Sequence, residues 1–225
     1  MNTAQAKPIP TTQSFHENLK DTVLLGDCVQ IMRSIAPGCA DFVLTDPPYL
    51  VRYCDRSGRR IANDADASWL LPAFAEIFRV LRRDSFCVTF YSWSHADKFI
   101  AAWRAAGFHL GGHLTFTKPY ASKERFLRYH HENAYLLTKG NPALPAVRIP
   151  DVLAWNYSGN RLHPTQKPLG ILTPIIESFS RLQDVVLDPF CGSGSTLLAA
   201  KLAGRRFLGI ELDEHYCNVA RDRLC

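Results

Sequence analysis

Residues 185–200 read VVLDPFCGSGSTLLAA, and this stretch decides the fold. An apolar run of strand length comes first, and an apolar helical segment comes last. Between them, Gly192 and Gly194 permit positive φ angles and a close backbone approach to a ligand, while Ser195 or Thr196 can cap the helix. A strand, a glycine-rich turn and a helix in this order predict a nucleotide-type binding turn in an α/β protein.

Short apolar runs alternate with helical patterns along the rest of the chain. The runs of strand length lie at 23–25, 42–44, 86–91, 111–117, 133–138, 185–187 and 207–210. Apolar residues at helical spacing mark one helix face at 70–81 and another at 169–179. This alternation predicts an α/β fold, with a mainly parallel sheet covered by helices on both faces.

Four of the apolar runs end in an acid or just before one. These acids are Asp27, Asp46, Asp188 and Glu211. Any single acid in such a place can instead be a helix N-cap. In an open α/β sheet, however, ligands bind outside the carboxyl ends of the strands, so four acids there predict one shared crevice. Glu211 follows the strand after the glycine turn, where an acid commonly holds ribose hydroxyls.

The sequence DPPY at residues 46–49 indicates the chemistry of this crevice. Pro47 and Pro48 fix φ and offer no N–H, so the backbone here presents acceptors only. Asp46 adds an ionised acceptor, and Tyr49 adds an aromatic face for stacking. Such a site suits a flat ring that carries an exocyclic amine, from which the site would accept two hydrogen bonds.

The two motifs together resemble those of the amino-group DNA methyltransferases, from about residue 23 to the C-terminus. The motif order, with DPPY before the glycine turn, is similar to the beta group of that family. The resemblance implies a Rossmann-like S-adenosylmethionine-dependent methyltransferase fold, with S-adenosylmethionine as cofactor and double-stranded DNA as substrate. It also implies the catalytic residues Asp46, Pro47, Pro48 and Tyr49.

The predicted cofactor residues come partly from the glycine turn and partly from the resemblance. The family places Asp27 toward the adenine of the cofactor and Asp188 near its methionine portion. A tract of the kind HPTQKP, here residues 163–168, recurs in the family and offers donors near the cofactor carboxylate, while Pro168 can open the following helix. A proline-stiffened linker is the alternative interpretation of this tract. The full predicted set is Asp27, Cys28, His163, Thr165, Gln166, Lys167, Asp188, Phe190, Cys191, Gly192, Ser193, Gly194, Glu211 and Leu212.

The positive charge of the chain, +5 overall, is concentrated in two segments. Residues 51–60 hold four basic residues against one acidic residue, and residues 118–161 hold seven against three. Phosphates held beside the chemistry would explain this placement, although two solvated basic loops would give the same pattern. By resemblance, a target-recognition insertion falls at about 118–161, and the predicted nucleic-acid contacts are Arg52, Arg56, Lys118, Lys123, Arg125, Arg128 and Arg161.

The mechanism we hypothesise begins with a target nucleotide that flips out of the duplex and stacks on Tyr49. Its amine then donates to Asp46 and the Pro47 carbonyl, which frees the nitrogen lone pair for direct displacement at the sulfonium methyl. In the family, Asp at the first motif position is associated mostly with adenine N6 and Ser with cytosine N4, so adenine is favoured.

Several other functions compete with an adenine-N6 DNA methyltransferase. A cytosine-N4 enzyme, an RNA or protein-amide methyltransferase and a non-enzymatic nucleic-acid-binding relative are the alternatives. A P-loop phosphotransferase fits poorly because no Lys follows the glycine turn, and a Rossmann dehydrogenase because its strict glycine spacing is missing. No nuclease motif is evident, so a stand-alone enzyme is expected, with a separate restriction nuclease left open as a partner.

Length and composition fit one catalytic domain at residues 21–225 after a flexible segment at residues 1–20. No apolar stretch approaches the length of a membrane span. The seven cysteines include no CxxC pair and no spacing that fits a zinc site, so we expect reduced thiols, no metal and a cytoplasmic location. Because the family often forms homodimers, a homodimer is an expectation by resemblance.

Overall fold

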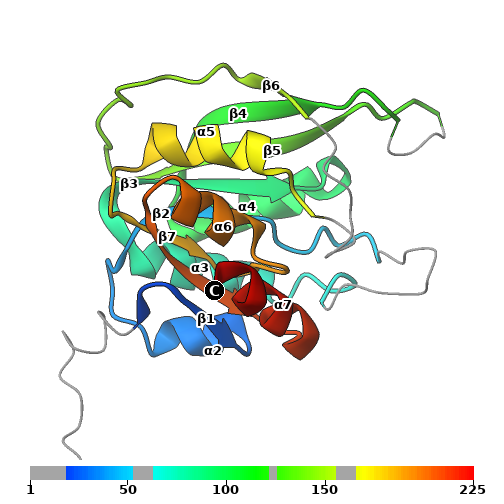
Figure 1. Cartoon of the computed structure of the whole chain (residues 1–225). Helices are drawn as coiled ribbons and strands as arrows, with labels where there is room; N and C mark the ends of the chain where they lie inside the picture. The colour runs from blue at the N-terminus through cyan, green and yellow to red at the C-terminus, as the bar shows by residue number, and fades with distance from the viewer. Residues whose placement is uncertain (1–18, 53–62, 122–125, 156–165) are drawn as a thin grey trace, which may run out of the picture.

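Eight strands form one sheet in this computed structural model, which describes residues 19–52, 63–121, 126–155 and 166–225 (Figure 1). The strands are β1 (Thr22–Leu25), β2 (Ala40–Thr45), β3 (Leu81–Tyr91), β4 (His109–Thr117), β5 (His131–Lys139), β6 (Val152–Ala154), β7 (Val185–Asp188) and β8 (Arg206–Glu211). Their order is β1-β8-β7-β2-β3-β5-β4-β6. β5 is antiparallel to β3 and β4, and the other neighbouring pairs are parallel. The prediction of a mainly parallel sheet is confirmed.

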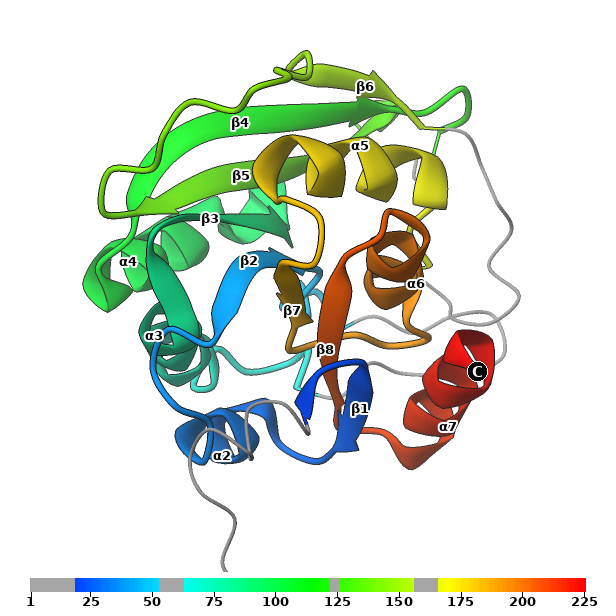
Figure 2. The ribbon, with the colours of Figure 1, turned by 60° about the vertical axis from the view of Figure 1, so that its left-hand side comes forward.

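Helices cover both faces of the sheet, as predicted (Figure 2). They are α2 (Cys28–Arg33), α3 (Leu70–Val80), α4 (Ala96–Ala106), α5 (Leu169–Phe179), α6 (Ser195–Leu202) and α7 (Glu214–Leu224), with a 3-10 turn η1 (Trp93–His95). α2, α3 and α4 pack in succession over one face, and α5, α6 and α7 over the other. Each face therefore has its own hydrophobic core.

Side chains of the central strands alternate between these two cores, as the pleat of a strand requires. In β2, Phe42 and Leu44 belong to the core beneath α5, α6 and α7, whereas Val43 belongs to the core beneath α2, α3 and α4. All three side chains are fully buried. Burial of each stabilises the fold by about 1.5–3 kcal/mol before the entropy of ordering is counted. Because helices cover both faces of the sheet, side chains on both sides of these strands are buried, and the strands appear in the sequence as near-continuous apolar runs.

The starts of two helices lie at the ends of strands that carry predicted site residues. Asp27 is the N-cap of α2, where its Oδ1 accepts a hydrogen bond from the N–H of Gln30 at 2.9 Å. Gly194 is the N-cap of α6, with a left-handed φ of 78°, and Ser195 and Thr196 lie inside the helix. The prediction that a hydroxyl side chain caps α6 is wrong, because the turn requires a left-handed residue there, which glycine adopts most readily.

The sequence patterns missed α2, α4, α7 and β6, and β3 begins five residues before its apolar run. α2 has six residues and β6 has three, so neither is long enough to show a period. In β3, the buried first residue Leu81 is followed by the exposed charged residues Arg82, Arg83 and Asp84, which interrupt the apolar pattern of the strand. β5 and β6 fall within the predicted recognition insertion 118–161, so part of that segment belongs to the main sheet.

Some predictions fall on residues outside the described ranges. They are the N-terminal segment up to residue 18 and the site residues Arg56, Lys123, Arg125, Arg161, His163 and Thr165. Leu19, near the end of the predicted flexible segment, packs against the core beneath α2, α3 and α4. Within the ranges that the structure describes, no helix has the length and apolarity needed to cross a membrane.

Gly209→Ala should destabilise the protein by about 1–3 kcal/mol, because the core has no room for a methyl group on β8. A Cβ at Gly209 would lie 2.4 Å from Cδ1 of Leu197 and 3.0 Å from Sγ of Cys191, and both side chains are buried. Gly170→Ala on α5 is the matched control, since a Cβ there meets nothing within 4 Å. Urea unfolding of both variants checks this prediction, which equal stabilities would contradict.

Candidate active site

A cavity of about 370 Å³ lies at the carboxyl ends of β1, β2, β7 and β8. Asp27, Asp46, Asp188 and Glu211 all line it, so the four acids at strand ends share one crevice. Further members of the predicted set that line the cavity are Cys28, Pro47, Pro48, Tyr49, Gln166, Lys167, Phe190, Cys191, Gly192, Ser193 and Leu212. The DPPY motif and the glycine turn therefore face one space, although they lie far apart in the sequence.

Gly194 is a predicted cofactor residue that does not line the cavity. It packs against α7, where an added Cβ would lie 3.0 Å from Cβ of Ala220. Its part is to shape the turn. Sequence reasoning missed other lining residues, among them Asn63, Asp64, Asp213 and Tyr216. Only Asp213 had a usable signal, since it is an acid directly before α7, where its side chain accepts a hydrogen bond from the N–H of Tyr216.

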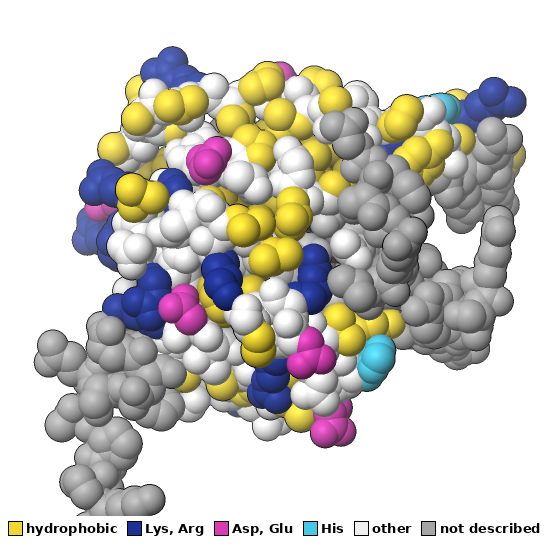
Figure 3. All heavy atoms as spheres, viewed as in Figure 1, with side chains coloured by type: hydrophobic (Ala, Val, Ile, Leu, Met, Phe, Trp, Pro, Cys, Tyr) yellow, Lys and Arg dark blue, Asp and Glu magenta, His cyan; other side chains and the backbone are white. Residues whose placement is uncertain are grey.

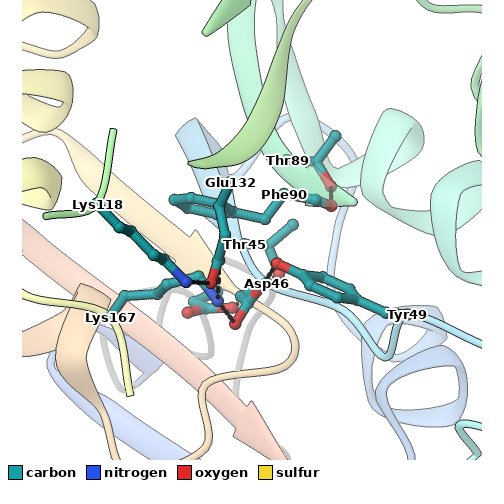
Figure 4. A network of polar contacts seen from close by, with 9 residues as sticks. Thr45, Asp46, Tyr49, Thr89, Phe90, Lys118, Glu132 and Lys167 are labelled. Atoms are coloured by element: carbon teal, nitrogen blue, oxygen red, sulfur yellow. Dashed lines mark hydrogen bonds and ion pairs between the residues drawn. The ribbon is translucent and has the colours of Figure 1, made fainter. Parts of the chain in front are cut away.

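Asp46 is held by two partners, one on each carboxylate oxygen (Figure 4). It follows Thr45, the buried last residue of β2, and its side chain is 19% exposed. Its Oδ1 accepts a hydrogen bond from the Tyr49 hydroxyl at 2.7 Å, and its Oδ2 forms an ion pair with Nζ of Lys167. Burial raises the pKa of Asp46, while Lys167 and Tyr49 oppose that rise. The two partners therefore fix the carboxylate and favour its ionised form.

Lys167 belongs to a buried chain of alternating charges. Its side chain is 6% exposed, and its Nζ lies between Asp46 and Glu132, 3.5 Å from Oε2 of Glu132. Glu132, from β5, also pairs with Lys118 at the end of β4 (Figure 4). Burial disfavours the charged form of Lys167, but Asp46 and Glu132 outweigh it and raise its pKa. Burial likewise disfavours the ionised form of Glu132, but the two lysines outweigh it and lower its pKa.

Asp188 joins the end of β2 to the glycine turn. It is 2% exposed, and its Oδ1 accepts hydrogen bonds from the Thr45 hydroxyl at 2.8 Å and the N–H of Phe190 at 3.1 Å. The Thr196 side chain also hydrogen-bonds to Asp188. Burial remains the largest influence and raises the pKa of Asp188 to about 7. This carboxyl group is therefore poised to change its charge near neutral pH.

Glu211 anchors the glycine turn from the neighbouring strand. Its Oε2 accepts a hydrogen bond from the N–H of Gly192 at 2.8 Å, and its Oε1 accepts one from the N–H of Asp213 at 2.8 Å. Burial raises the pKa of Glu211, and these backbone donors oppose the rise. Each oxygen keeps a second lone pair, so Glu211 can hold the turn and accept ligand hydroxyls together.

Two thiols in the cavity wall are poor nucleophiles. Burial raises the pKa of Cys28 to about 12 and that of Cys191 well above its ordinary value. A thiol with a raised pKa stays protonated at neutral pH, and the thiolate is the reactive form. Across the described ranges, no group of three or more His, Cys, Asp or Glu side chains is placed to hold a metal ion.

The N6_N4_Mtase family model, which describes DNA methylases, matches residues 40–222. This chain belongs to that DNA methylase family. The Escherichia coli K12 protein YubD is 54% identical to it over 199 residues, which is 88% of each chain. The type II methyltransferase M.HinfI of Haemophilus influenzae is 24% identical over 92% of this chain and 70% of its own.

Solved structures share the fold of this DNA methylase. The complex of M1.HpyAVI with S-adenosylmethionine matches with a TM-score of 0.72 at 24% identity, covering 90% of this chain and 98% of its own. The cytosine-N4-specific PvuII DNA methyltransferase matches with a TM-score of 0.74 at 18% identity, covering 91% of this chain and 86% of its own.

These matches confirm the predicted family, the Rossmann-like methyltransferase fold and S-adenosylmethionine as the cofactor of this class. The chain is a DNA methyltransferase of the N6/N4 family. Because one neighbour of the same fold is a cytosine-N4 enzyme, family and fold do not select between adenine and cytosine.

The predicted nucleic-acid contacts of this methylase lie in different surroundings. Arg52 and Arg128 are exposed, on the segment after β2 and at the end of the β4–β5 hairpin. Figure 3 shows basic and histidine side chains beside hydrophobic ones at that hairpin end, where Phe126 is 85% exposed. Lys118 differs from the prediction, because its ammonium is buried in the ion pair with Glu132 and offers no exposed charge to a phosphate.

Asp188→Asn should remove a loss of stability that the wild type shows as the pH rises. Between the ordinary carboxyl value of 3.8 and about 7, folded Asp188 keeps a proton that the unfolded chain releases, so wild-type stability falls with pH. Asn cannot ionise, so the variant should gain up to about 4 kcal/mol relative to the wild type across this window. Urea unfolding of both proteins from about pH 4 to 8 measures the difference. A difference independent of pH would contradict the prediction.

Proposed function

We propose that this protein transfers a methyl group from S-adenosylmethionine to the N6 amine of a flipped adenine in double-stranded DNA. One observation carries the proposal: Asp46 and Tyr49 of the DPPY motif line the same cavity as the glycine turn that Glu211 anchors. An amine acceptor and a cofactor turn on one cavity are what a direct transfer between two bound molecules needs.

The residues that would hold the cofactor fit it in size and chemistry. A cavity of about 370 Å³ lies within the range of small-molecule sites. Glu211 would accept the ribose hydroxyls, Asp27 and Leu212 would lie toward the adenine, and Asp188 toward the methionine portion. When bound, S-adenosylmethionine supplies an electrophilic methyl group on a positively charged sulfur. The acids of the wall complement that charge.

The substrate half of the site follows from Asp46, Pro47 and Tyr49. A base inside a duplex cannot present its amine to a buried cavity, so the nucleotide must leave the stack. Tyr49 is half-buried and offers a ring face for stacking. Asp46 and the Pro47 carbonyl would accept the two N–H bonds, and the carboxylate would stabilise the positive charge that develops on the amine nitrogen. In such a transfer the nitrogen–carbon bond would form as the carbon–sulfur bond breaks, and the proton that the amine then releases would pass to Asp46 or to solvent.

Adenine is proposed over cytosine because Asp at the first position of the motif is associated mostly with adenine in this family. Cytosine N4 is the second candidate, since the PvuII enzyme has this fold and is cytosine-N4-specific. Both bases carry an amine beside a ring nitrogen, so the same acceptors would serve either. Two exposed arginines support phosphate contacts: Arg52, which follows the lining residue Val51, and Arg128 at the end of the β4–β5 hairpin. Homodimer formation stays a prediction.

Asp46→Asn should lower kcat for methyl transfer by about 100-fold or more, because the variant loses the charge that stabilises the developing cation. Cofactor binding should stay close to wild type, since Asp46 lies on the amine side of the cavity. The measurement is transfer of labelled methyl from S-adenosylmethionine to unmethylated duplex DNA, followed by mass analysis of the nucleosides and calorimetric titration with the cofactor.

Asp222→Asn is the matched control, because it removes one exposed carboxylate from α7 at a residue that does not line the cavity. It should keep wild-type transfer. Near-full activity of Asp46→Asn would overturn the proposed mechanism. Wild-type methyl on cytosine N4 would correct the base alone, and wild-type cofactor binding without methyl on DNA would overturn DNA as the substrate.

A further inference from the structure

The ammonium of Lys167 lies where the sequence did not predict it. The resemblance assigns Lys167 to the cofactor carboxylate, but in the structure its Nζ pairs with Oδ2 of Asp46 and lies 3.5 Å from Oε2 of Glu132. Both partners lie on the side of the site where the target amine would bind. Asp46 belongs to the DPPY motif, and Glu132 lies on β5. The side chain of Lys167 therefore acts on Asp46.

We infer that Lys167 is a positioning residue for Asp46, and that Glu132 and Lys118 hold it in place. This inference rests on the proposed function, in which Asp46 accepts the N–H bonds of the target amine. Lys167 fixes one carboxylate oxygen and favours the ionised form of the group, against the effect of burial. The free lone pairs of both oxygens then remain available to the amine.

Burial is the reason that Asp46 needs such a partner. A carboxylate removed from water tends to take up a proton, and a protonated Asp46 would present an O–H donor to an amine that also donates. Tyr49 donates one hydrogen bond to Asp46 but carries no positive charge. In the described part of the chain, Lys167 is the cation paired with Asp46, so it supplies the charge that opposes protonation.

Aromatic rings restrict the position of the Lys167 ammonium. Its Nζ lies 5.4 Å from the ring centroid of Tyr49, 4.8 Å from that of Phe90 and 5.9 Å from that of Trp155. Phe90 and Trp155 are buried, so these two rings are fixed walls. Cation–π attraction adds to the two ion pairs and holds the ammonium beside Asp46.

The charged groups around Asp46 act on its ionisation with opposite signs. Lys167 favours the carboxylate, whereas Glu132 on β5 disfavours it. Asp188, at the end of β7, is a further acid whose own pKa Asp46 raises. Lys118 is the remaining member of the ion-pair chain and faces Glu132. Removal of Lys167 and removal of the Glu132 charge should therefore move the acid limb of the activity profile in opposite directions.

The test measures kcat against pH at saturating cofactor and DNA, for wild type, Lys167→Met, Lys167→Arg and Glu132→Gln. Lys167→Met should lower kcat by about 100-fold and move the acid limb to higher pH, because Asp46 loses the neighbouring cation. Lys167→Arg keeps the charge, so its limb should stay near that of wild type with partial activity. Glu132→Gln should move the limb to lower pH. Saturating cofactor keeps any titration of Asp188 that affects cofactor binding out of kcat.

Each outcome decides between distinct possibilities. An acid limb that stays unchanged in Lys167→Met would overturn the inference. A rise in KM for the cofactor with kcat kept would also overturn it, and would make Lys167 a cofactor residue. If Lys167→Met fails to fold, the pH profiles of Lys167→Arg and Glu132→Gln test the inference instead. An acid limb of kcat that does not move to lower pH in Glu132→Gln would overturn it. A wild-type protein that methylates no DNA at any pH would instead overturn the proposed function.

Discussion

The parallel arrangement of β1, β8, β7 and β2 is the constraint on which the site depends. Parallel strands end at the same edge of a sheet, so the residues that follow them meet at one place whatever their distance in sequence. Asp27, Asp46, Asp188 and Glu211 are brought together in this way. Helices cover both faces of the sheet, so the carboxyl edge is where a ligand can approach. The site is thus a product of topology, and local sequence then adjusts its chemistry.

Burying several ionised carboxylates in one cavity costs free energy, and each carboxylate is stabilised by a different set of partners. Burial raises the pKa of Asp46, Asp188 and Glu211. Backbone N–H groups hold Glu211, two hydroxyls and an N–H hold Asp188, and an ammonium and a hydroxyl hold Asp46. Among these partners, only the ammonium of Lys167 carries a full positive charge. A cationic ligand such as a sulfonium on the side of Asp188 and Glu211 would therefore favour the ionised forms of these two acids, which burial disfavours.

Local signals in the sequence were sufficient for seven of the eight described strands, for the glycine turn and for the acids at strand ends. Ion pairs between side chains from distant segments were not predictable, because only the folded chain brings such side chains together. Lys118 shows the reason: a lysine in a basic segment has the same pattern whether it meets water or Glu132. Glu132 itself had no signal, since one acid in the polar start of a strand usually marks a solvated face. Only the pairing of β4 with β5 brings these two side chains together.

The ion-pair chain also connects the site to the β4–β5 hairpin. Glu132 and Lys118 lie where the two strands meet the connecting loop, and this loop carries the exposed residues Phe126 and Arg128. The same Glu132 contacts Lys167, which contacts Asp46. Because buried ion pairs are only weakly screened, any shift of the hairpin that moves Glu132 would change the electrostatic field at Lys167. The hairpin within the predicted recognition segment and the carboxylate proposed to accept the amine therefore share one set of contacts, and the geometry of each constrains the other.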